Sequence, residues 1–222
     1  MKKITLLIVV VLVAMLVSNF NLMATCEFCY APKQCVVITV PVNYTVSYPP
    51  WHIIQNVTFT LCYECSITNP GMTAEIIEID GLVQGQEDKA WDAAFKWVSD
   101  HQAELCGHTP CETGSDHIVY KLPICGGWEY DGNNPPAPNP PTYRMKYQPG
   151  GCMVYCIQEW DQCYCNCIPP CDGDPGCPAP HVKLGTITST MSATPTCDWA
   201  PTIVRGVPNS ADCARVHTDC NP

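Results

Sequence analysis

Cysteines are the residues of this chain whose number and spacing could do chemistry. The sequence has 222 residues and contains 18 cysteines. Such a set can bind a metal, form redox-active pairs or build a disulfide framework, and the even number allows every cysteine to be paired. We regard all of them as disulfide candidates: Cys26, Cys29, Cys35, Cys62, Cys65, Cys106, Cys111, Cys125, Cys152, Cys156, Cys163, Cys165, Cys167, Cys171, Cys177, Cys197, Cys213 and Cys220.

Two Cys-x-x-Cys motifs have the spacing of metal knuckles and of redox pairs. They are Cys26 with Cys29 and Cys62 with Cys65. Their separation exceeds the roughly 15–20 residues between the pairs of a zinc ribbon, and no strand-to-helix transition follows the second motif directly. Structural disulfides are the favoured interpretation, so we predict no metal and no cofactor. Metal ligation and redox catalysis stay open as alternatives.

A second dense group of cysteines lies in the stretch CIQEWDQCYCNC, residues 156–167. Four thiolates from this region and the residues after it could hold an iron–sulfur cluster. As disulfides, Cys163, Cys165 and Cys167 should each reach a different segment, because alternate strand residues are too far apart to bridge easily. We expect Cys156 to pair with Cys163 across a turn at EWDQ. In the same way, a bridge between Cys106 and Cys111 should close the loop after the predicted helix.

The N-terminal residues 1–24 have the pattern of a secretory signal peptide. Two lysines precede an apolar run over residues 6–17, and cleavage is expected after Ala24. An uncleaved membrane anchor is the alternative. Export would place the cysteines in an oxidising compartment, where this density is typical of a disulfide scaffold. The short lysine-led segment is typical of a bacterial protein.

The charge balance excludes several kinds of partner. The chain has 11 basic and 21 acidic residues, for a net charge of −10. Binding to nucleic acid needs clustered Lys and Arg, and so does adsorption to anionic lipid. The only basic cluster, Arg144 and Lys146, fits an ordinary solvated strand face. We therefore expect no nucleic-acid partner and no membrane contact beyond signal-peptide export.

Hydrophobic periodicity predicts a mainly β (α+β) fold, with an antiparallel sheet and one amphipathic helix. Residues 36–48 and 57–63 alternate apolar and polar residues, which favours two half-buried strands. Pro41 places the first of these at a sheet edge or at a bulge. A third strand is expected over residues 74–79, ending in a turn at Asp80-Gly81. Residues 86–106 have the apolar spacing of a helix.

The C-terminal half should be a disulfide-stapled, loop-rich β-hairpin region. Residues 131–142 are rich in proline and predict a linker or an exposed loop. They would separate a β-rich domain, 25–130, from a Cys-rich hairpin and tail, 143–222. In the second part we expect a hairpin between residues 143–147 and 152–158, and one weak strand at 181–188.

Evidence for catalytic machinery is weak. The sequence has no GxSxG elbow and no HExxH metal motif. Glu75, Glu78 and Asp80 on the third predicted strand could form an acid/base pair, although solvent-facing acids on a strand are the ordinary explanation.

The sequence therefore predicts a secreted, disulfide-stabilised, non-enzymatic protein, either a structural or a binding component. It would be located outside the cell, at the cell surface or in the periplasm, with other extracellular proteins, glycans or copies of itself as partners. Aromatic binding candidates are Trp51, Trp128, Tyr130, Tyr155 and Trp160, since Tyr and Trp offer contact area at low entropic cost. The edge strand at residues 36–48 could pair with another copy. The alternatives are a secreted hydrolase or thiol oxidoreductase, and a disulfide-stapled inhibitor of extracellular enzymes.

Overall fold

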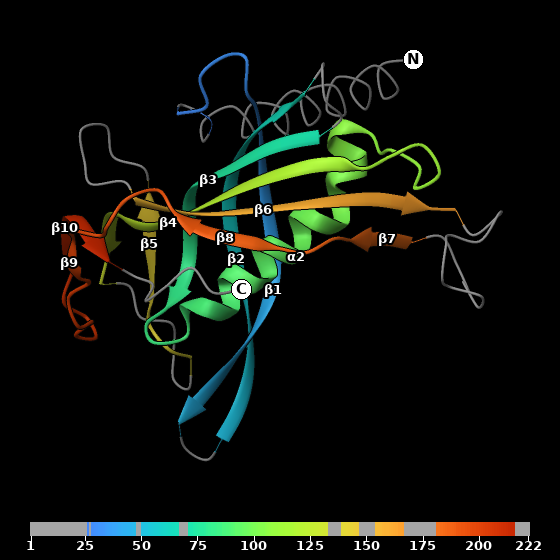
Figure 1. Cartoon of the computed structure of the whole chain (residues 1–222). Helices are drawn as coiled ribbons and strands as arrows, with labels where there is room; N and C mark the ends of the chain where they lie inside the picture. The colour runs from blue at the N-terminus through green and yellow to red at the C-terminus, as the bar shows by residue number, and fades with distance from the viewer. Residues whose placement is uncertain are drawn as a thin grey trace, which may run out of the picture.

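The structure is a computed structural model that describes residues 26, 28–47, 50–66, 71–132, 139–146, 154–166 and 181–215. The expected signal peptide, residues 1–24, lies outside these ranges. The described part contains one helix, α2, and a sheet of ten strands (Figure 1). The predicted mainly β class with one helix is confirmed.

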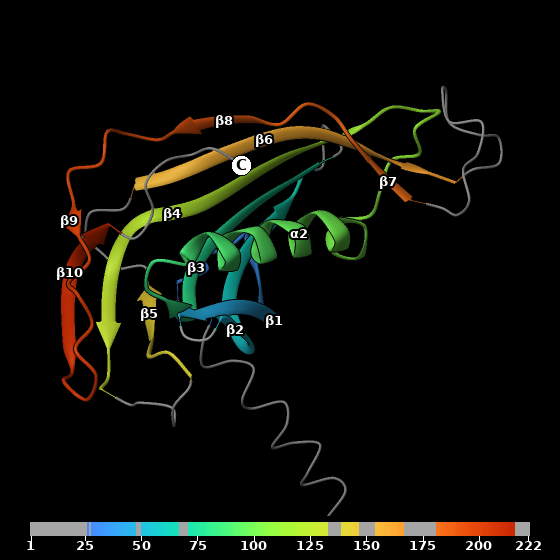
Figure 2. The ribbon, with the colours of Figure 1, turned by 90° about the horizontal axis from the view of Figure 1, so that it is seen from below.

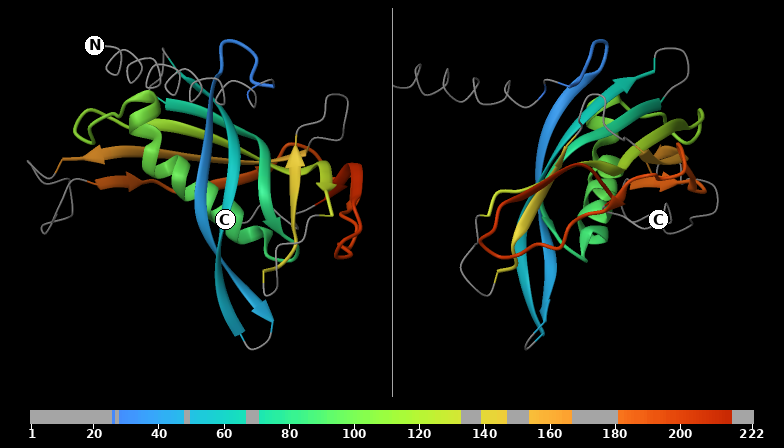
Figure 3. Two further views of the ribbon diagram at one scale, coloured as in Figure 1. Left: turned by 180° about the vertical axis from the view of Figure 1, so that it is seen from behind. Right: turned by 90° about the vertical axis from the view of Figure 1, so that its left-hand side faces the viewer.

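The first hairpin follows the alternation in its sequence. β1 (Gln34–Ser47) and β2 (Pro50–Cys65) pair antiparallel without a register shift. Along β1, Ile38 and Tyr44 are buried while Thr39 is exposed, as the period of two requires. Within the described chain β1 pairs with β2 alone, so it forms a sheet edge, where Pro41 costs no ladder bond. The turn end of this hairpin projects beyond the rest of the sheet (Figures 1 and 3).

The third strand is longer than predicted. β3 (Gly71–Val83) runs through Asp80-Gly81, so the turn expected there is wrong. The dipeptide forms an irregularity instead, because the register with the neighbouring strand shifts between Asp80 and Leu82. Gly81 has φ +92°, and a Cβ built on it would lie 2.7 Å from the Asn56 carbonyl oxygen. Only glycine fits this close approach.

The helix α2 (Glu87–Cys106) packs against one face of the sheet (Figure 2). Glu87 and Asp88 in its first turn complement the helix dipole, and Gly107, with φ +77°, ends it. The predicted helix at 86–106 is confirmed. We call the sheet face that α2 covers the inner face and the opposite one the outer face.

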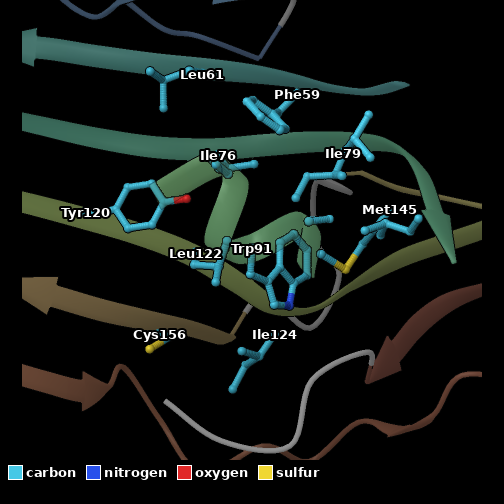
Figure 4. Close-up of a cluster of buried hydrophobic side chains, with 14 of the residues drawn as sticks. Phe59, Leu61, Ile76, Ile79, Trp91, Tyr120, Leu122, Ile124, Met145 and Cys156 are labelled. Carbon is cyan, nitrogen blue, oxygen red and sulfur yellow. The ribbon is translucent and has the colours of Figure 1, made fainter. Parts of the chain in front are cut away.

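The hydrophobic core lies between α2 and the inner face. Trp91 from the helix meets apolar side chains of β2, β3 and β4 (Figure 4). Phe59, Ile76 and Tyr120 are almost fully buried there. Phe95 of the helix packs on Trp160, with ring centroids 5.0 Å apart. The core thus joins elements from both halves of the sequence.

β4 (Asp116–Tyr130) is the central strand and has different neighbours along its length. Its first half pairs in parallel with β3 and antiparallel with β6 (Val154–Cys165). Its second half pairs antiparallel with β5 (Thr142–Lys146) and with β10 (Asn209–Arg215). The sheet is therefore mixed, rather than antiparallel throughout.

Two predictions about this region are wrong. β5 lies between β3 and β4, whereas β6 pairs with the first half of β4, so the described residues 143–146 and 154–158 do not pair in the hairpin expected between 143–147 and 152–158. The turn expected at EWDQ is also absent, because β6 continues through these residues. Trp160 is 2% exposed and stands opposite Ile118 in the ladder, which explains why the strand is not interrupted.

The C-terminal strands are short. β7 (His181–Leu184) and β8 (Thr188–Met191) pair with β6, and β9 (Asp198–Trp199) pairs in parallel with β10. Strands from both sides of residues 131–142 belong to one sheet. The division into domains 25–130 and 143–222 stays a prediction. No helix in the described part of the chain is long and apolar enough to cross a bilayer.

Candidate functional site

The described cysteines are all disulfide-bonded. Ten of them form five bridges whose Cα–Cα distances lie between 4.9 and 6.3 Å, within the usual range. The bridges are Cys26–Cys35, Cys29–Cys62, Cys65–Cys106, Cys111–Cys163 and Cys125–Cys197. Cys156, Cys165 and Cys213 are disulfide-bonded as well. The remaining candidates lie outside the described residues: Cys152, Cys167, Cys171, Cys177 and Cys220.

Neither Cys-x-x-Cys motif forms a bridge of its own. Cys26 and Cys29 are bonded to Cys35 and Cys62, respectively. Cys65, the second cysteine of the other motif, is bonded to Cys106 at the end of α2. In a thioredoxin-like site the two cysteines of one motif form and break a disulfide with each other. The cysteines of these two motifs are bonded to cysteines elsewhere, so neither motif is such a site. In the described part of the chain, no group of three or more Cys, His, Asp or Glu residues could hold a metal ion.

Two predicted pairings are wrong. Cys106 bonds to Cys65 rather than to Cys111, because the end of α2 lies against the end of β2. Cys163 bonds to Cys111 rather than to Cys156. Since β6 is continuous, Cys156 and Cys163 cannot face each other across a turn. The expectation that Cys163 reaches a different segment is met, but that segment is the loop after α2.

Three of the aromatic binding candidates are buried, which corrects their expected exposure. Trp128 and Tyr130 are each 1% exposed, and Trp160 is 2% exposed. Trp128 packs on Tyr143, with ring centroids 5.6 Å apart, and the Trp160 indole N–H donates to the Gln162 side-chain oxygen at 2.8 Å. These side chains build the core, since they occupy the inner-facing positions of β4 and β6.

The other two aromatic candidates have different outcomes. Tyr155 is half-buried. The backbone of Trp51 is part of β2, but its side chain lies outside the described part.

The aromatic residues that the structure does expose are Tyr30 and Trp199, with 67% and 58% of their surface accessible. The guanidinium of Arg215 lies 4.8 Å from the centroid of the Trp199 ring, a cation–π contact. Neither position is signalled by the sequence pattern, because Tyr30 lies outside any strand and β9 is only two residues long. Tyr30 and Trp199 are therefore exposed aromatic residues that the sequence reasoning did not single out.

An ionic cluster occupies the outer face where β3, β5 and β4 lie side by side. Arg144 of β5 donates to Glu129 of β4 at 2.8 Å, and its other terminal nitrogen lies 3.5 Å from Glu78 of β3. The Lys146 ammonium lies 3.2 Å from the same Glu129 carboxylate. We call Glu78, Asp80, Glu129, Arg144 and Lys146 the outer-face cluster. It explains the basic pair seen in the sequence: Glu78 and Glu129 are its ion-pair partners, and the charge of Asp80 also acts on Arg144.

The two glutamates of this cluster have pKa values shifted in opposite directions. Burial raises the pKa of Glu78, and the Arg144 guanidinium offsets this only in part. Hydrogen bonds from Arg144 and Lys146 lower the pKa of Glu129. Opposite shifts in neighbouring carboxyl groups are also found in acid/base pairs of enzymes. Here both groups contact one arginine, so the arrangement clamps three strands together by paired charges.

Glu75, the third acid of the sequence hypothesis, lies elsewhere on the outer face. It forms an ion pair with Lys33 from the segment before β1. Burial raises its pKa, but hydrogen bonds from Lys33 and Tyr155 lower it overall. Cys26–Cys35 and Cys29–Cys62 fix the same N-terminal segment. Glu75 thus anchors this segment, and it does not contact Glu78 or Asp80 in a shared site.

The comparisons with known proteins identify no relative: no protein-family model, no curated protein and no solved structure matches the chain. The chain is a disulfide-stabilised, mainly β protein.

Proposed function

We propose that this protein is an exported, non-enzymatic component of the cell surface or the extracellular space, with a structural or binding role. The observation that carries the proposal is that every cysteine among the described residues is disulfide-bonded. Disulfides persist in oxidising compartments and are rare where thiols are kept reduced.

The placement of the bridges supports a role that requires durability. They join the N-terminal segment to β1 and β2, β2 to the helix, the loop after the helix to β6, and β4 to the tail. Each bridge limits the freedom of the unfolded chain, which stabilises the folded state by about 2–4 kcal/mol in typical cases. A framework spread over the whole fold suits a protein that meets proteases outside the cell.

A binding role would use exposed side chains on this rigid frame. Trp199 with Arg215 is the contact point that we propose for an extracellular protein or a glycan, because an exposed indole offers a flat apolar surface. Copies of the same chain are the other proposed partner.

The proposal is tested by the location and the thiol content of the protein. Chain purified from the culture medium or the cell envelope is denatured, and its free thiols are titrated before and after reduction, with metal analysis alongside. We expect no free thiol before reduction, all cysteines after it, and no bound metal. A protein that stays in the cytosol, or that carries free thiols with a stoichiometric metal, would contradict the proposal.

The enzymatic alternative has its own test, which uses the opposite pKa shifts of Glu78 and Glu129. The purified protein is assayed against panels of glycosides, esters and peptides, together with the variants E78Q and E129Q. We expect no turnover. Turnover that both substitutions abolish, in variants that remain folded, would replace the binding role with a hydrolase. Inhibition of proteases in the same panels would instead favour the inhibitor.

A further inference from the structure

The edge of β1 on the side away from β2 is a long row of backbone peptide groups flanked by uncharged side chains. From Gln34 to Ser47 the strand carries no charged side chain, and most of its residues are Val, Ile, Thr or Tyr. Natural proteins usually protect exposed edges with charges or by covering them, because an open edge can pair with another chain. The described residues supply no strand on this side of β1.

The hydrogen bonds of Thr45 show which peptide groups face this edge. The Thr45 N–H donates to the Gln86 side-chain oxygen at 2.8 Å, and the Gln86 side-chain nitrogen donates to the Thr45 carbonyl at 2.7 Å. Alternate residues of an antiparallel strand direct both peptide groups to the same side. The peptide groups of Val37, Thr39, Pro41 and Asn43 therefore point away from β2 as well.

Gln86 thus imitates a neighbouring strand at one residue. Its amide makes the same pair of bonds to Thr45 that an antiparallel partner would make. Its own backbone is fixed in the turn between β3 and α2, since its N–H donates at 3.0 Å to the carbonyl of Val83, the last residue of β3. The Lys89 ammonium donates to the Thr45 hydroxyl and to the Gln86 side-chain oxygen, each at 3.1 Å, which adds a positive charge beside the edge.

Pro41 weakens the rest of the edge. It lies four residues before Thr45, so its missing N–H is a donor that an incoming strand would need. The open stretch from Val37 to Asn43 keeps only the outward N–H groups of Val37, Thr39 and Asn43. A full ladder along β1 therefore requires the peptide groups of Thr45 and the space that Gln86 occupies.

We propose that the Gln86 side chain gates self-association through β1, so that two copies pair edge to edge only after Gln86 leaves Thr45. A second copy fits this edge because β1 is uncharged and self-complementary. In a two-fold antiparallel pairing centred near Val40, the Pro41 carbonyl accepts from Thr39 of the other copy, and the apolar inner-facing residues continue one surface. This inference rests on the part of the proposed function in which the partner is another copy of the same chain.

The unmodified protein gives the first test, by hydrogen exchange of single amides at neutral pH. We expect the Thr45 amide to be protected, and the Thr39 and Asn43 amides to exchange at least tenfold faster. A Thr45 amide that exchanges as fast as Thr39 would overturn the proposal, because the Gln86 contact would then not persist. A strongly protected Thr39 would overturn it too, since the edge would already be covered.

Two variants give the second test, by sedimentation velocity across a hundredfold range of concentration. Q86A should form dimers or larger species at concentrations where the unmodified protein is monomeric. Q86A combined with T39P should return to monomer, because the second proline removes another outward donor without touching the β2 ladder. E104A, a change at an exposed position of the same helix, is the matched control and should stay monomeric. Circular dichroism checks that each variant is folded.

The outcomes separate this inference from the proposed function. A folded Q86A that stays monomeric, or an association that T39P does not reduce, would overturn the gate while leaving the thiol titration untouched. Free thiols in the titration would contradict export, even where Q86A associates as expected.

Discussion

The body of the molecule, residues 34–130, and the tail, residues 181–215, are held in place by different forces. The body has long strands and a helix around a dense core, whereas the tail has four short strands at the rim of the sheet (Figure 2). In the described tail, Ala214 is the single buried apolar residue. Five of the seven large apolar residues that the described chain exposes lie there: Leu184, Met191, Trp199, Val204 and Val207.

The difference shows that burial contributes much less in the tail, where residues such as Ile187, Ala200 and Ile203 are only partly buried against the core. Its strands are fixed by ladder bonds to β6 and β4, by the Cys125–Cys197 bridge and by single polar contacts such as the Gly206 N–H donating to the Tyr130 hydroxyl at 3.2 Å. In the body, removal of apolar surface from water supplies the main stabilising term. Substitutions should therefore act on the two regions by different mechanisms.

A large-to-small change should be costly in the body and nearly silent in the tail. Phe59 is 1% exposed beneath α2, so F59A should lower the free energy of unfolding by about 3–5 kcal/mol. V204A, at a residue that is 59% exposed, should change it by less than about 0.5 kcal/mol. Urea unfolding of the oxidised proteins, followed by tryptophan fluorescence, measures both. Similar losses in the two variants would show that the tail has a core of its own.

Removing the bridge between body and tail should lower stability and loosen the tail before the body. In C125A/C197A the loop of 72 residues is no longer closed, and stability should fall by about 2–4 kcal/mol. Limited proteolysis should then cut first between residues 198 and 215, while the body fragment persists. If the variant and the parent are cleaved at the same rate, or if cleavage begins in the body, the bridge does not hold the tail in place.

The outer-face cluster should give the two glutamates opposite effects on acid stability. Because the pKa of Glu129 is lowered, its carboxylate stabilises the folded state at pH values above the ordinary pKa of 4.5. This stabilisation is lost as the pH falls through the lowered pKa. The raised pKa of Glu78 means the reverse: its ionised form costs stability above that pKa, and protonation removes the cost.

Variants separate these two contributions. At pH 7, E129Q should lower stability by up to about 1 kcal/mol, since half-exposed ion pairs contribute little, and E78Q should leave it unchanged or raise it slightly. The loss in E129Q should shrink progressively as unfolding is measured at pH values further below 4.5. A loss in E78Q at pH 7 that exceeds the loss in E129Q would contradict the assigned shifts.

The smallest effect is expected at the exposed indole of the tail. W199A removes a ring that is 58% exposed and its contact with Arg215, which should cost no more than about 0.5–1 kcal/mol. Thermal unfolding checks the stability, and a glycan or protein binding screen checks the contact role. If the unmodified protein binds a partner and W199A binds it equally well, Trp199 is not part of the proposed binding surface.

The sequence predicted the parts of the fold that depend on local periodicity. The alternation around Ile38 and Phe59 placed β1 and β2, and the apolar spacing around Trp91 placed the helix. Pro41 correctly indicated an edge because the missing N–H is a local property.

The rest depends on which segments meet across long distances. Asp80-Gly81 has the composition of a turn, but β3 continues through it with an irregular register, and Gly81 lies close to the Asn56 backbone of β2. The Cys106–Cys111 bridge was inferred from nearness in sequence, whereas the pairing follows the packing of α2 on β2. Trp128, Tyr130 and Trp160 failed as binding candidates for a related reason, since an aromatic ring that is free to bind and one that fills a core look the same in a sequence.

The position of β4 also has a consequence for the order of folding. Its pairing partners begin at Gly71 and end at Arg215, so the strand draws its neighbours from most of the chain. Sheets with such distant pairings form slowly, because the entropy of closing long loops is lost before the contacts between the strands can compensate for it. Synthesis delivers the N-terminal part first, so the second half of β4 cannot complete its pairing until β10 has been made. The native sheet is therefore completed only after residue 215 has emerged, which makes its assembly a late event of biogenesis.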